Sequence, residues 1–400
     1  MSKKRVTIIG GGAAGFFCAA NLNPNQYDVC ILEQNSDVLQ KVKISGGGRC
    51  NVTHACFDPR ELVQFYPRGN KELLSVFTKF QPGDTMAWFS DRGVELKIEN
   101  DNRVFPITDS SQTIINTLVK GATDNKVTIK TKTSVKDILP SENGYEIQTN
   151  QGVVETDILI YTTGSSPKSL QLIEKLGHKI VSPVPSLFTF NIKDELLKDL
   201  PGTSFVNATV SIPELKSEES GPLLITHWGL SGPAILKISA WEARTLADKK
   251  YNFSILANFI DLDKEDAKSK ITDFKEQNPK KTLGQSKIFD ITNRFWNRIL
   301  EVSKINPEMQ ISQLSSKSLA LLVENLSEKK LYVSGKSTFK DEFVTAGGVD
   351  LKEIDFKTMR SKILPNVYIA GEVLNIDAVT GGFNFQACWS EAYLIAQDLN

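Results

Sequence analysis

Residues 6–15 read Val-Thr-Ile-Ile-Gly-Gly-Gly-Ala-Ala-Gly, and this stretch decides the fold. The apolar run that ends at Gly10 predicts a buried strand, and residues 13–22 after it predict a helix. Residues 27–32 predict a second buried strand. A strand, a glycine turn, a helix and a strand in this order are the opening of a dinucleotide-binding α/β unit.

The spacing Gly10-x-Gly12-x-x-Gly15 gives each glycine a separate task. Gly10 makes the tight turn, Gly12 lets a diphosphate approach the backbone, and Gly15 lets the helix pack closely on the strand. Glu33 ends the second strand eighteen residues after Gly15, where a carboxylate can bind both ribose hydroxyls and disfavours a 2′-phosphate. We therefore expect NAD or FAD rather than NADP, although a glycine turn of another α/β protein is the alternative.

Composition narrows the class of protein. The chain has 400 residues, which suggests two or three domains, and its 47 basic residues balance its 47 acidic ones. That balance excludes a globally basic nucleic-acid coat. No apolar run is long enough for a membrane span, and the strand that begins at Val6 leaves no room for a signal peptide. An odd number of cysteines, five, fits reduced thiols, so we expect a cytoplasmic protein.

A metal site is not expected. Cys50 and Cys56 bracket His54, but the spacing is wide and a fourth ligand is missing.

The character of the sequence changes after residues 183–185. Residues 187–260 carry strand-like runs, and residues 264–330 are lysine-rich and helical in pattern. Strand patterns return at 344–349 and 367–371, and a helix is expected from 382 to 399. We interpret residues 187–340 as an insertion into a nucleotide-binding domain.

Two remote glycine clusters could hold the far end of a long cofactor such as FAD. Residues 44–51 contain Gly46, Gly47 and Gly48 followed by Arg49, a fixed cation, so residues 41–51 are expected to form a loop. Residues 369–386 show the same pattern, which predicts a strand, a glycine turn and the start of a helix. A purely structural turn is the alternative for the second cluster.

Five blocks of sequence together resemble one family. They are GGGAAG at 10–15, ISGGGRCNVTH at 44–54, THWGLSGPAIL at 226–236, TAGGV at 345–349 and IAGEVLNIDAVTGGFNFQACWSEA at 369–392. Their order over nearly the whole chain resembles the bacterial YhiN/BaiN-like (HI0933-like) flavoproteins, also called the aminoacetone-oxidase-like family. The resemblance implies FAD and a glutathione-reductase-like, three-layer (ββα) FAD-binding Rossmann domain at residues 1–186 and 341–400. It also implies an inserted β-barrel, placed at 187–260, with a basic helical part at 264–330.

The resemblance assigns cofactor contacts residue by residue. The diphosphate would meet Gly10, Gly12, Ala13, Ala14 and Gly15, the adenosine ribose Glu33 with Gln34, and the adenine the backbone of Val135. The flavin side would be lined by Lys43, Gly47, Gly48, Arg49, Cys50 and Asn51, and the turn Thr163-Gly164 would lie beside the cofactor. Asp377, Gly382, Asn384, Phe385 and Gln386 would close over the ribityl chain and flavin, and Gly371 and Glu372 would also bind the cofactor.

The chain departs from the family pattern twice. The segment after Gly164 is short, and Asn375 stands where many members have Asp. Both departures bear on the substrate rather than on FAD.

The expected chemistry needs a hydride from the flavin and a proton from an acid on the opposite side of the substrate. Cys50 is one candidate acid, since a thiol near Arg49 can have a tuned pKa; packing against the flavin is its alternative role. His227, in a Gly/Ser/Pro-rich turn, is the other candidate. Because only one nucleotide motif is present, NAD(P)H would visit the flavin transiently as hydride donor.

Charge is concentrated in the insertion. Residues 264–340 contain fifteen Lys or Arg and nine Asp or Glu, an excess of six positive charges. The cations singled out are Lys280, Lys281, Lys287, Arg294, Arg298, Lys304, Lys329, Lys330, Lys336 and Lys340, with the aromatic residues Phe295, Trp296 and Tyr332 between them. Such a pattern suits an RNA phosphate surface, and a merely solvated helical face is the alternative.

Three functions stay open. The resemblance implies reduction of uridine to dihydrouridine in 23S ribosomal RNA, reduction of unsaturated steroid or bile-acid ketones, and oxidation of small amino-ketones. We therefore weigh an RNA uridine reductase first, a small-molecule flavin reductase or oxidase second, and a non-catalytic flavin-binding protein third.

Overall fold

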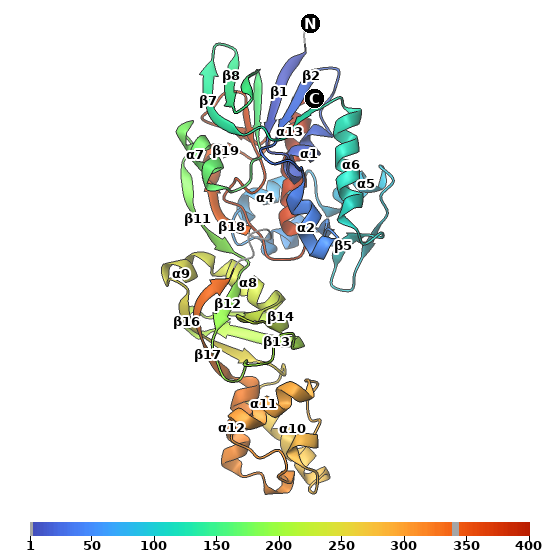
Figure 1. Cartoon of the computed structure of the whole chain (residues 1–400). Coiled ribbons are helices and arrows are strands. Elements are labelled where there is room, and N and C mark those ends of the chain that lie inside the picture. The colour runs from blue at the N-terminus through green and yellow to red at the C-terminus, as the bar shows by residue number, and fades with distance from the viewer. Residues whose placement is uncertain (1–2, 338–343) are drawn as a thin grey trace. The chain divides into compact units, whose positions relative to one another are not determined.

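The computed structural model describes residues 3–337 and 344–400, and the chain divides into two compact units (Figure 1). The first unit combines both ends of the chain, Met1–Val184 and Lys340–Asn400, and the second is the continuous segment Pro185–Phe339. No helix in the described ranges has both the length and the apolar character needed to cross a membrane.

A seven-stranded sheet organises the first unit. In spatial order its strands are β19 (Ile354–Asp355), β20 (Arg360–Ser361), β21 (Val367–Ile369), β10 (Ile158–Tyr161), β1 (Lys4–Ile9), β2 (Tyr27–Leu32) and β6 (Thr128–Lys130). The strands from β21 to β6 are parallel, with Val6 opposite Ile158 on one side and Val29 on the other. The central strand β10 is a continuous apolar run, and β1 is buried from Val6 to Ile9, because both faces of a parallel sheet are buried.

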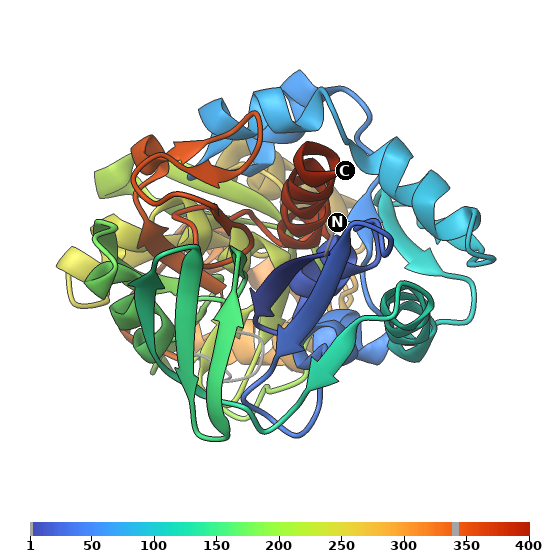
Figure 2. The ribbon, with the colours of Figure 1, turned by 90° about the horizontal axis from the view of Figure 1, so that it is seen from above.

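Two further layers complete the predicted ββα arrangement. A smaller antiparallel sheet of β7 (Val135–Ser141), β8 (Gly144–Thr149) and β9 (Gly152–Thr156) packs on β10 and β1. Helices α1 (Ala13–Ala19), α6 (Ser111–Asp124) and α13 (Phe383–Leu399) pack together beside the main sheet. Figure 2 shows α13 in dark red and the green strands of the smaller sheet on different sides of blue β1 and β2.

Shorter elements fill the rest of the first unit. Its remaining strands are β3 (Thr53–His54), β4 (Leu96–Ile98) and β5 (Arg103–Pro106), which form one sheet, and β11 (Ile180–Ser186) paired with β18 (Val344–Val349). Its remaining helices are α2 (Gln40–Gly48), α3 (Pro59–Leu62), α4 (Asn70–Phe77), α5 (Pro82–Ser90), α7 (Pro167–Lys175), and the 3₁₀ turns η1 (Val63–Phe65) and η5 (Leu351–Glu353).

The loop predicted from Lys41 onward is wrong for its first residues. The backbone is helical from Gln40 to Ile44 and leaves the helix at Ser45, with φ −62° and ψ 146°. Gly46 and Gly47 then adopt left-handed conformations, with φ of +57° and +68°. The helical half buries Val42, which is fully inaccessible to solvent, whereas the glycines that favour a loop begin only at Gly46.

The second unit contains a closed six-stranded barrel. Its order is β12 (Thr189–Ile192), β15 (Gly229–Ser231), β14 (Ser217–Ile225), β13 (Ser204–Ile212), β16 (Asn252–Asn258) and β17 (Lys329–Ser337). Helices not predicted from the sequence, α8 (Pro233–Trp241) and α9 (Ala243–Asp248), interrupt the strands; α8 buries Ala234, Ile235 and Ile238 in the barrel core.

A helical part continues that core. It comprises α10 (Lys264–Gln277), α11 (Asn293–Val302) and α12 (Ser316–Ser327), with the 3₁₀ turns η2 (Pro213–Leu215) near the barrel and η3 (Leu283–Gln285) and η4 (Ile311–Gln313) among the helices. Phe295 and Trp296 on α11 are 0% and 4% exposed, and the Trp296 indole donates to the Leu283 carbonyl at 2.8 Å. These two aromatic residues therefore form core, and reading them as part of an RNA surface is wrong.

Candidate cofactor site

The three fingerprint glycines have different surroundings. Gly10 has φ +110°, and a Cβ there would lie 2.3 Å from the Thr162 carbonyl oxygen. A Cβ on Gly15 would lie 2.2 Å from the Gly10 carbonyl oxygen, so β1 and α1 can approach only without a side chain. A Cβ on Gly12 would meet nothing within 4 Å. Gly12 thus borders open space beside the turn, as a diphosphate site requires.

Glu33 lies behind this turn with 9% exposure. Its Oε2 accepts from the Gly11 N–H at 2.9 Å, and its Oε1 accepts from the backbone and side-chain N–H groups of Asn35, both at 2.8 Å. These bonds hold the carboxylate at the end of β2 beside the glycine turn. Oε1 already accepts two hydrogen bonds, but Oε2 accepts only one and keeps a further lone pair, so a ribose hydroxyl can still donate to Oε2.

The second glycine cluster also faces open space. Cβ atoms on Gly47 and Gly48 would meet nothing within 4 Å, and both residues have positive φ. Arg49, by contrast, is occupied: its guanidinium pairs with Glu99 and Asp109 and lies 3.9 Å over the Phe105 ring. The backbone of this cluster, rather than the arginine charge, is what it offers to a ligand.

The start of α13 meets Asn51 from that cluster. Gly382 caps α13 without a side-chain hydrogen bond, and a Cβ there would lie 2.6 Å from the Thr53 carbonyl and 2.8 Å from Asn51 Oδ1. Asn51 is 9% exposed, and its Oδ1 is buried with no hydrogen-bond partner among the described residues. A buried acceptor beside a helix start with free N–H groups fits a ligand edge that carries both donors and acceptors, as the flavin ring does.

Three residues assigned to the flavin are instead engaged with the protein through their side chains. Asp377 is fully buried and forms an ion pair with Arg68. Asn384 exchanges two hydrogen bonds with the backbone of Ala378, at 3.0 and 3.2 Å. Gln386 is fully buried, accepts from the hydroxyls of Thr53 and Thr85, and donates to Ser390. The side chains of Asp377 and Gln386 lie in the protein interior, Asn384 is only partly buried, and the assigned flavin contacts of all three stay predictions.

The other assigned residues all lie in the first unit. Gln34 and Lys43 are exposed, Val135 begins β7, and Thr163-Gly164 follows β10 with Gly164 at φ +70°. Ala13 and Ala14 form the first turn of α1, and Phe385 stacks on Trp389 with ring centroids 5.6 Å apart. Gly371 follows β21, and the next residue, Glu372, pairs with Lys41 on α2.

The two candidate proton donors lie in different units. Burial raises the pKa of the Cys50 thiol to about 12, against a smaller opposing effect of the Ser45 hydroxyl, so the thiol keeps its proton at neutral pH. Arg49 is paired elsewhere, so burial rather than the arginine charge is what shifts the pKa of the Cys50 thiol. His227 is exposed in the turn between β14 and β15, next to Trp228, which is 60% exposed.

Sequence reasoning missed Glu391 and the partnerless amide oxygen of Asn375. Glu391 is 1% exposed on α13, and Asn375 Oδ1 is buried without a hydrogen-bond partner in the described part of the chain. A lone acid in the apolar stretch Ala-Cys-Trp-Ser-Glu-Ala could have signalled the first. The described residues contain no cluster of three or more His, Cys, Asp or Glu side chains suited to a metal ion.

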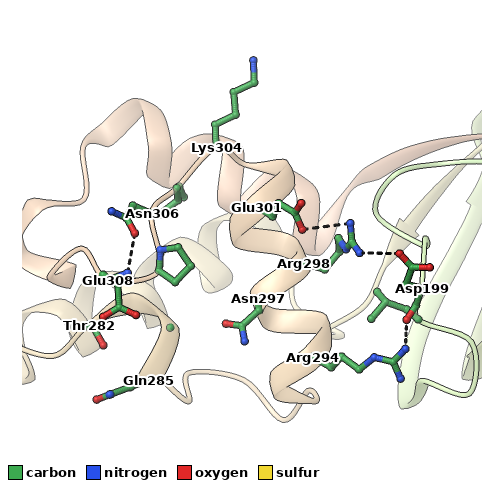
Figure 3. Close-up of a pocket in the computed structure, with 14 residues that line it drawn as sticks. Asp199, Thr282, Gln285, Arg294, Asn297, Arg298, Glu301, Lys304, Asn306 and Glu308 are labelled. Carbon is green, nitrogen blue, oxygen red and sulfur yellow. Dashed lines mark hydrogen bonds and ion pairs between the residues drawn. The ribbon is translucent and has the colours of Figure 1, made fainter.

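The basic residues of the second unit separate into two groups. A pocket of about 860 Å³ beside α11 is bordered by Arg294 and Arg298, and both are engaged (Figure 3). Arg298 pairs with Glu301 at 3.3 Å and Asp199 at 3.7 Å, and Arg294 donates to the Asp199 carbonyl. These two arginines tie α11 to the turn that contains Asp199 instead of offering free charge.

The remaining cations of the second unit are distributed over helices, loops and the barrel. Lys280, Lys281, Lys287 and Lys304 are exposed in the helical part, whereas Lys329, Lys330 and Lys336 lie on barrel strand β17 with Tyr332, which is 57% exposed. Lys340 lies outside the described residues.

Comparison with known proteins identifies relatives over the whole chain. The family model described as "HI0933-like protein Rossmann domain" matches residues 4–398. The chain is 28% identical over 413 residues to the ribosomal RNA dihydrouridine synthase of Escherichia coli, covering 100% of this chain and 98% of that protein. It is 25% identical over 404 residues to the 3-dehydro-bile acid Δ4,6-reductase of Clostridium scindens, covering 98% and 97%.

Solved structures share the fold. A 3-ketosteroid-Δ4-(5α)-dehydrogenase from Rhodococcus jostii superposes with a TM-score of 0.53 at 10% identity, covering 98% of this chain and 96% of that chain. A flavocytochrome c3 fumarate reductase gives 0.51 at 13% identity, covering 100% and 78%. At such identities the likeness concerns the fold alone.

Proposed function

Because the chain belongs to the HI0933-like family of Rossmann-fold FAD-dependent oxidoreductases, we propose that it uses NAD(P)H to reduce uridine to dihydrouridine in 23S ribosomal RNA. The observation that carries the proposal is the match, end to end, to relatives named ribosomal RNA dihydrouridine synthase in two organisms. The second of these, from Haemophilus influenzae, is 27% identical over 409 residues, covering 98% of both chains. Such a substrate would place the activity in the cytoplasm.

The residues of the first unit fit FAD. Gly12 would face the diphosphate, Glu33 the adenosine ribose, and Gly47, Gly48, Asn51 and the start of α13 the flavin end. Bound FAD would supply the hydride chemistry that reduction of a carbon–carbon double bond requires. The protein keeps a proton on Cys50 Sγ at neutral pH, and the partnerless Asn51 Oδ1 can accept one hydrogen bond from the ligand.

Exposed cations of the second unit support an RNA substrate. Lys280, Lys281 and Lys287 are exposed and form no ion pair within the described residues, although the Lys281 ammonium lies 5.4 Å from the centroid of the Phe274 ring. Lys330 and the exposed Tyr332 on β17 add a charge and an aromatic face on which a base can stack. A uridine in a folded RNA would have to leave its stack to reach a flavin.

A second candidate function is reduction of an unsaturated steroid-like ketone. It is favoured by the full-length relative named 3-dehydro-bile acid Δ4,6-reductase. In that case the basic residues of the second unit would have no substrate role.

The deciding experiment maps dihydrouridine in ribosomal RNA from a strain that lacks this protein. We expect mass spectrometry to find one 23S uridine unmodified, and re-expression of the protein to restore the modification. An unchanged dihydrouridine map would contradict the ribosomal substrate and leave the small-molecule reductase as the better proposal.

Charge reversal of these three exposed lysines tests RNA recognition. We expect Lys280→Glu/Lys281→Glu/Lys287→Glu to weaken binding of a labelled 23S fragment by about one to two orders of magnitude, because phosphate contacts dominate such affinity. Arg298 is left intact because reversing it would break its ion pairs.

The matched control is Lys71→Glu/Lys79→Glu/Lys175→Glu, which reverses three exposed lysines of the first unit. Its net charge changes by the same amount, and we expect at most a few-fold loss in RNA affinity. FAD content should be equal in both variants. Equal losses of RNA affinity in the two triple variants would show that only the net charge of the protein matters. That result would contradict a specific RNA-binding surface on the second unit.

A further inference from the structure

Glu391 is a buried acid with one hydrogen bond and no cation. Its Oε2 accepts from the Gly371 N–H at 2.6 Å, its exposure is 1%, and no ion pair to it exists among the described residues. Acids are almost never fully buried without a partner, so this position needs an explanation. Through this hydrogen bond Glu391 holds the turn that follows β21.

That turn lies against the glycine fingerprint. Gly371 has φ +83°, and a Cβ there would lie 3.4 Å from the Cβ of Ala14 and 3.7 Å from Cys388 Sγ. Ala14 is in the first turn of α1, two residues after Gly12 and its open space. The neighbouring Glu372 pairs with Lys41 on α2. Glu391 therefore fixes a backbone turn behind the place where a cofactor diphosphate would rest.

No cation pairs with Glu391 among the described residues; the Lys41 ammonium, whose charge acts on the neighbouring Cys388 thiol, pairs with Glu372. The titratable groups near it are the Cys388 thiol and the Tyr66 hydroxyl, and burial raises the pKa of both. Tyr66 donates to the Phe383 carbonyl at 2.6 Å, and the sole titratable residue of α1, Cys18, is a buried thiol. The other charged or titratable groups on elements packed against α13 are Lys71 and Glu72 on α4, Asp84 on α5 and His54 on β3, which bonds to the Gly381 carbonyl.

We propose that Glu391 is a positioning residue for the dinucleotide cofactor: its protonated carboxyl holds the Gly371 turn, and its ionisation weakens cofactor binding. The inference rests on the FAD site proposed above. A carboxylate formed there would be buried without a cation, and it would lie close to the negative diphosphate. Desolvation and like-charge repulsion both disfavour ionisation of Glu391. Bound cofactor therefore favours the protonated form of Glu391, and deprotonation favours release.

Burial sets the pH range of this effect. It raises the pKa of Glu391 to about 8, against the opposing hydrogen bond from the Gly371 N–H. Cofactor binding would raise that pKa further, so by linkage the Kd for FAD increases with pH above about 8, by at most tenfold per pH unit for one proton.

The test compares the wild type with Glu391→Gln by titrating apo-protein with FAD from pH 6.5 to 9.5 and following flavin fluorescence. Glutamine can still accept from the Gly371 N–H but cannot ionise. We expect the wild-type Kd to rise about five- to twentyfold between pH 7.5 and 9.5, and the Glu391→Gln Kd to change less than about twofold. Glu391→Ala, which leaves the Gly371 N–H unpaired, should bind FAD more weakly at every pH.

Two controls separate the role of Glu391 from general effects. Tyr66→Phe and Cys388→Ser remove the neighbouring titratable groups and should keep the wild-type pH dependence. A wild-type pH curve in Glu391→Gln, or a flat curve in the wild type, would overturn the role of Glu391. Absence of FAD binding by the wild type at pH 7 would instead overturn the FAD site itself.

Thermal unfolding of the apo-proteins gives an independent readout. Because the folded-state pKa lies above the ordinary value of 4.5, the stabilisation associated with Glu391 is fully present below about pH 4.5 and is lost as pH rises toward 8. We expect the Tm of Glu391→Gln to match the wild type near pH 4.5 and to exceed it at pH 8.5. An equal Tm difference at both pH values would contradict a buried, titrating carboxyl.

Discussion

Replacing Gly12 with valine should yield a folded protein that no longer retains FAD. A Cβ on Gly12 meets nothing within 4 Å, and φ −92° with ψ −166° is accessible to valine, so the fold tolerates the side chain. The valine would fill the space that the diphosphate must occupy. We expect the FAD Kd to increase by at least about a hundredfold, which corresponds to roughly 3 kcal/mol, with the Tm of the apo-protein changed by only a few degrees.

Gly15→Val is the matched contrast within the same motif. Its Cβ would lie 2.2 Å from the Gly10 carbonyl oxygen, so this variant should misfold or lose most of its stability. A circular dichroism melt and the absorbance of bound flavin measure both outcomes. A folded, yellow Gly12→Val protein would contradict a diphosphate site at this turn.

Gln386→Met should destabilise the protein without displacing the cofactor. The fully buried Gln386 side chain accepts from Thr53 at 2.6 Å and Thr85 at 2.9 Å, and it donates to Ser390 at 2.9 Å. Methionine has a similar volume but leaves two hydroxyl groups without their acceptor, at a cost of about 1–3 kcal/mol each. We expect urea unfolding to show a free energy of unfolding lower by about 2–4 kcal/mol.

The control removes the hydroxyl groups as well. In Thr53→Val/Thr85→Val/Gln386→Met no donor is left unpaired, so part of the lost stability should return. The FAD Kd of the folded Gln386→Met protein should stay within about threefold of the wild type. Unchanged stability with a large loss of FAD affinity would show instead that the Gln386 side chain faces the ligand.

The core of the first unit was predictable because its signals are local. The apolar run before Gly10, the glycine spacing and Glu33 all lie within about thirty residues. Together they form the local sequence pattern of a strand, a tight turn and a helix that binds a dinucleotide. The family resemblance then supplied the three-layer fold and the barrel, and the family match and the observed layers confirm that fold class. The acid at the end of β2 and the glycines where backbone segments approach closely can therefore be identified from the sequence alone.

What the sequence did not reveal depends on long-range contacts. Trp296 follows Phe295 in a basic segment, yet α11 turns both side chains into the core while its arginines bond to a turn about a hundred residues away. Gln386 lies in one of the sequence blocks that carry the family resemblance, but its side chain bonds to Thr53 and Thr85, which are remote in sequence. Helix α8 was missed because Pro233 begins it immediately after a strand, where a turn seemed the simpler expectation.

The most direct test of the account is titration of apo-protein with FAD and, in parallel, with FMN, which lacks the adenosine half. If FAD binds along the glycine fingerprint, Glu33 and the start of α13, we expect one FAD per chain. The Kd for FMN should then be at least about a hundredfold higher than that for FAD, a difference of roughly 3 kcal/mol in binding free energy. Equal affinity for FMN and FAD, or no binding of either, would contradict a dinucleotide held by these segments.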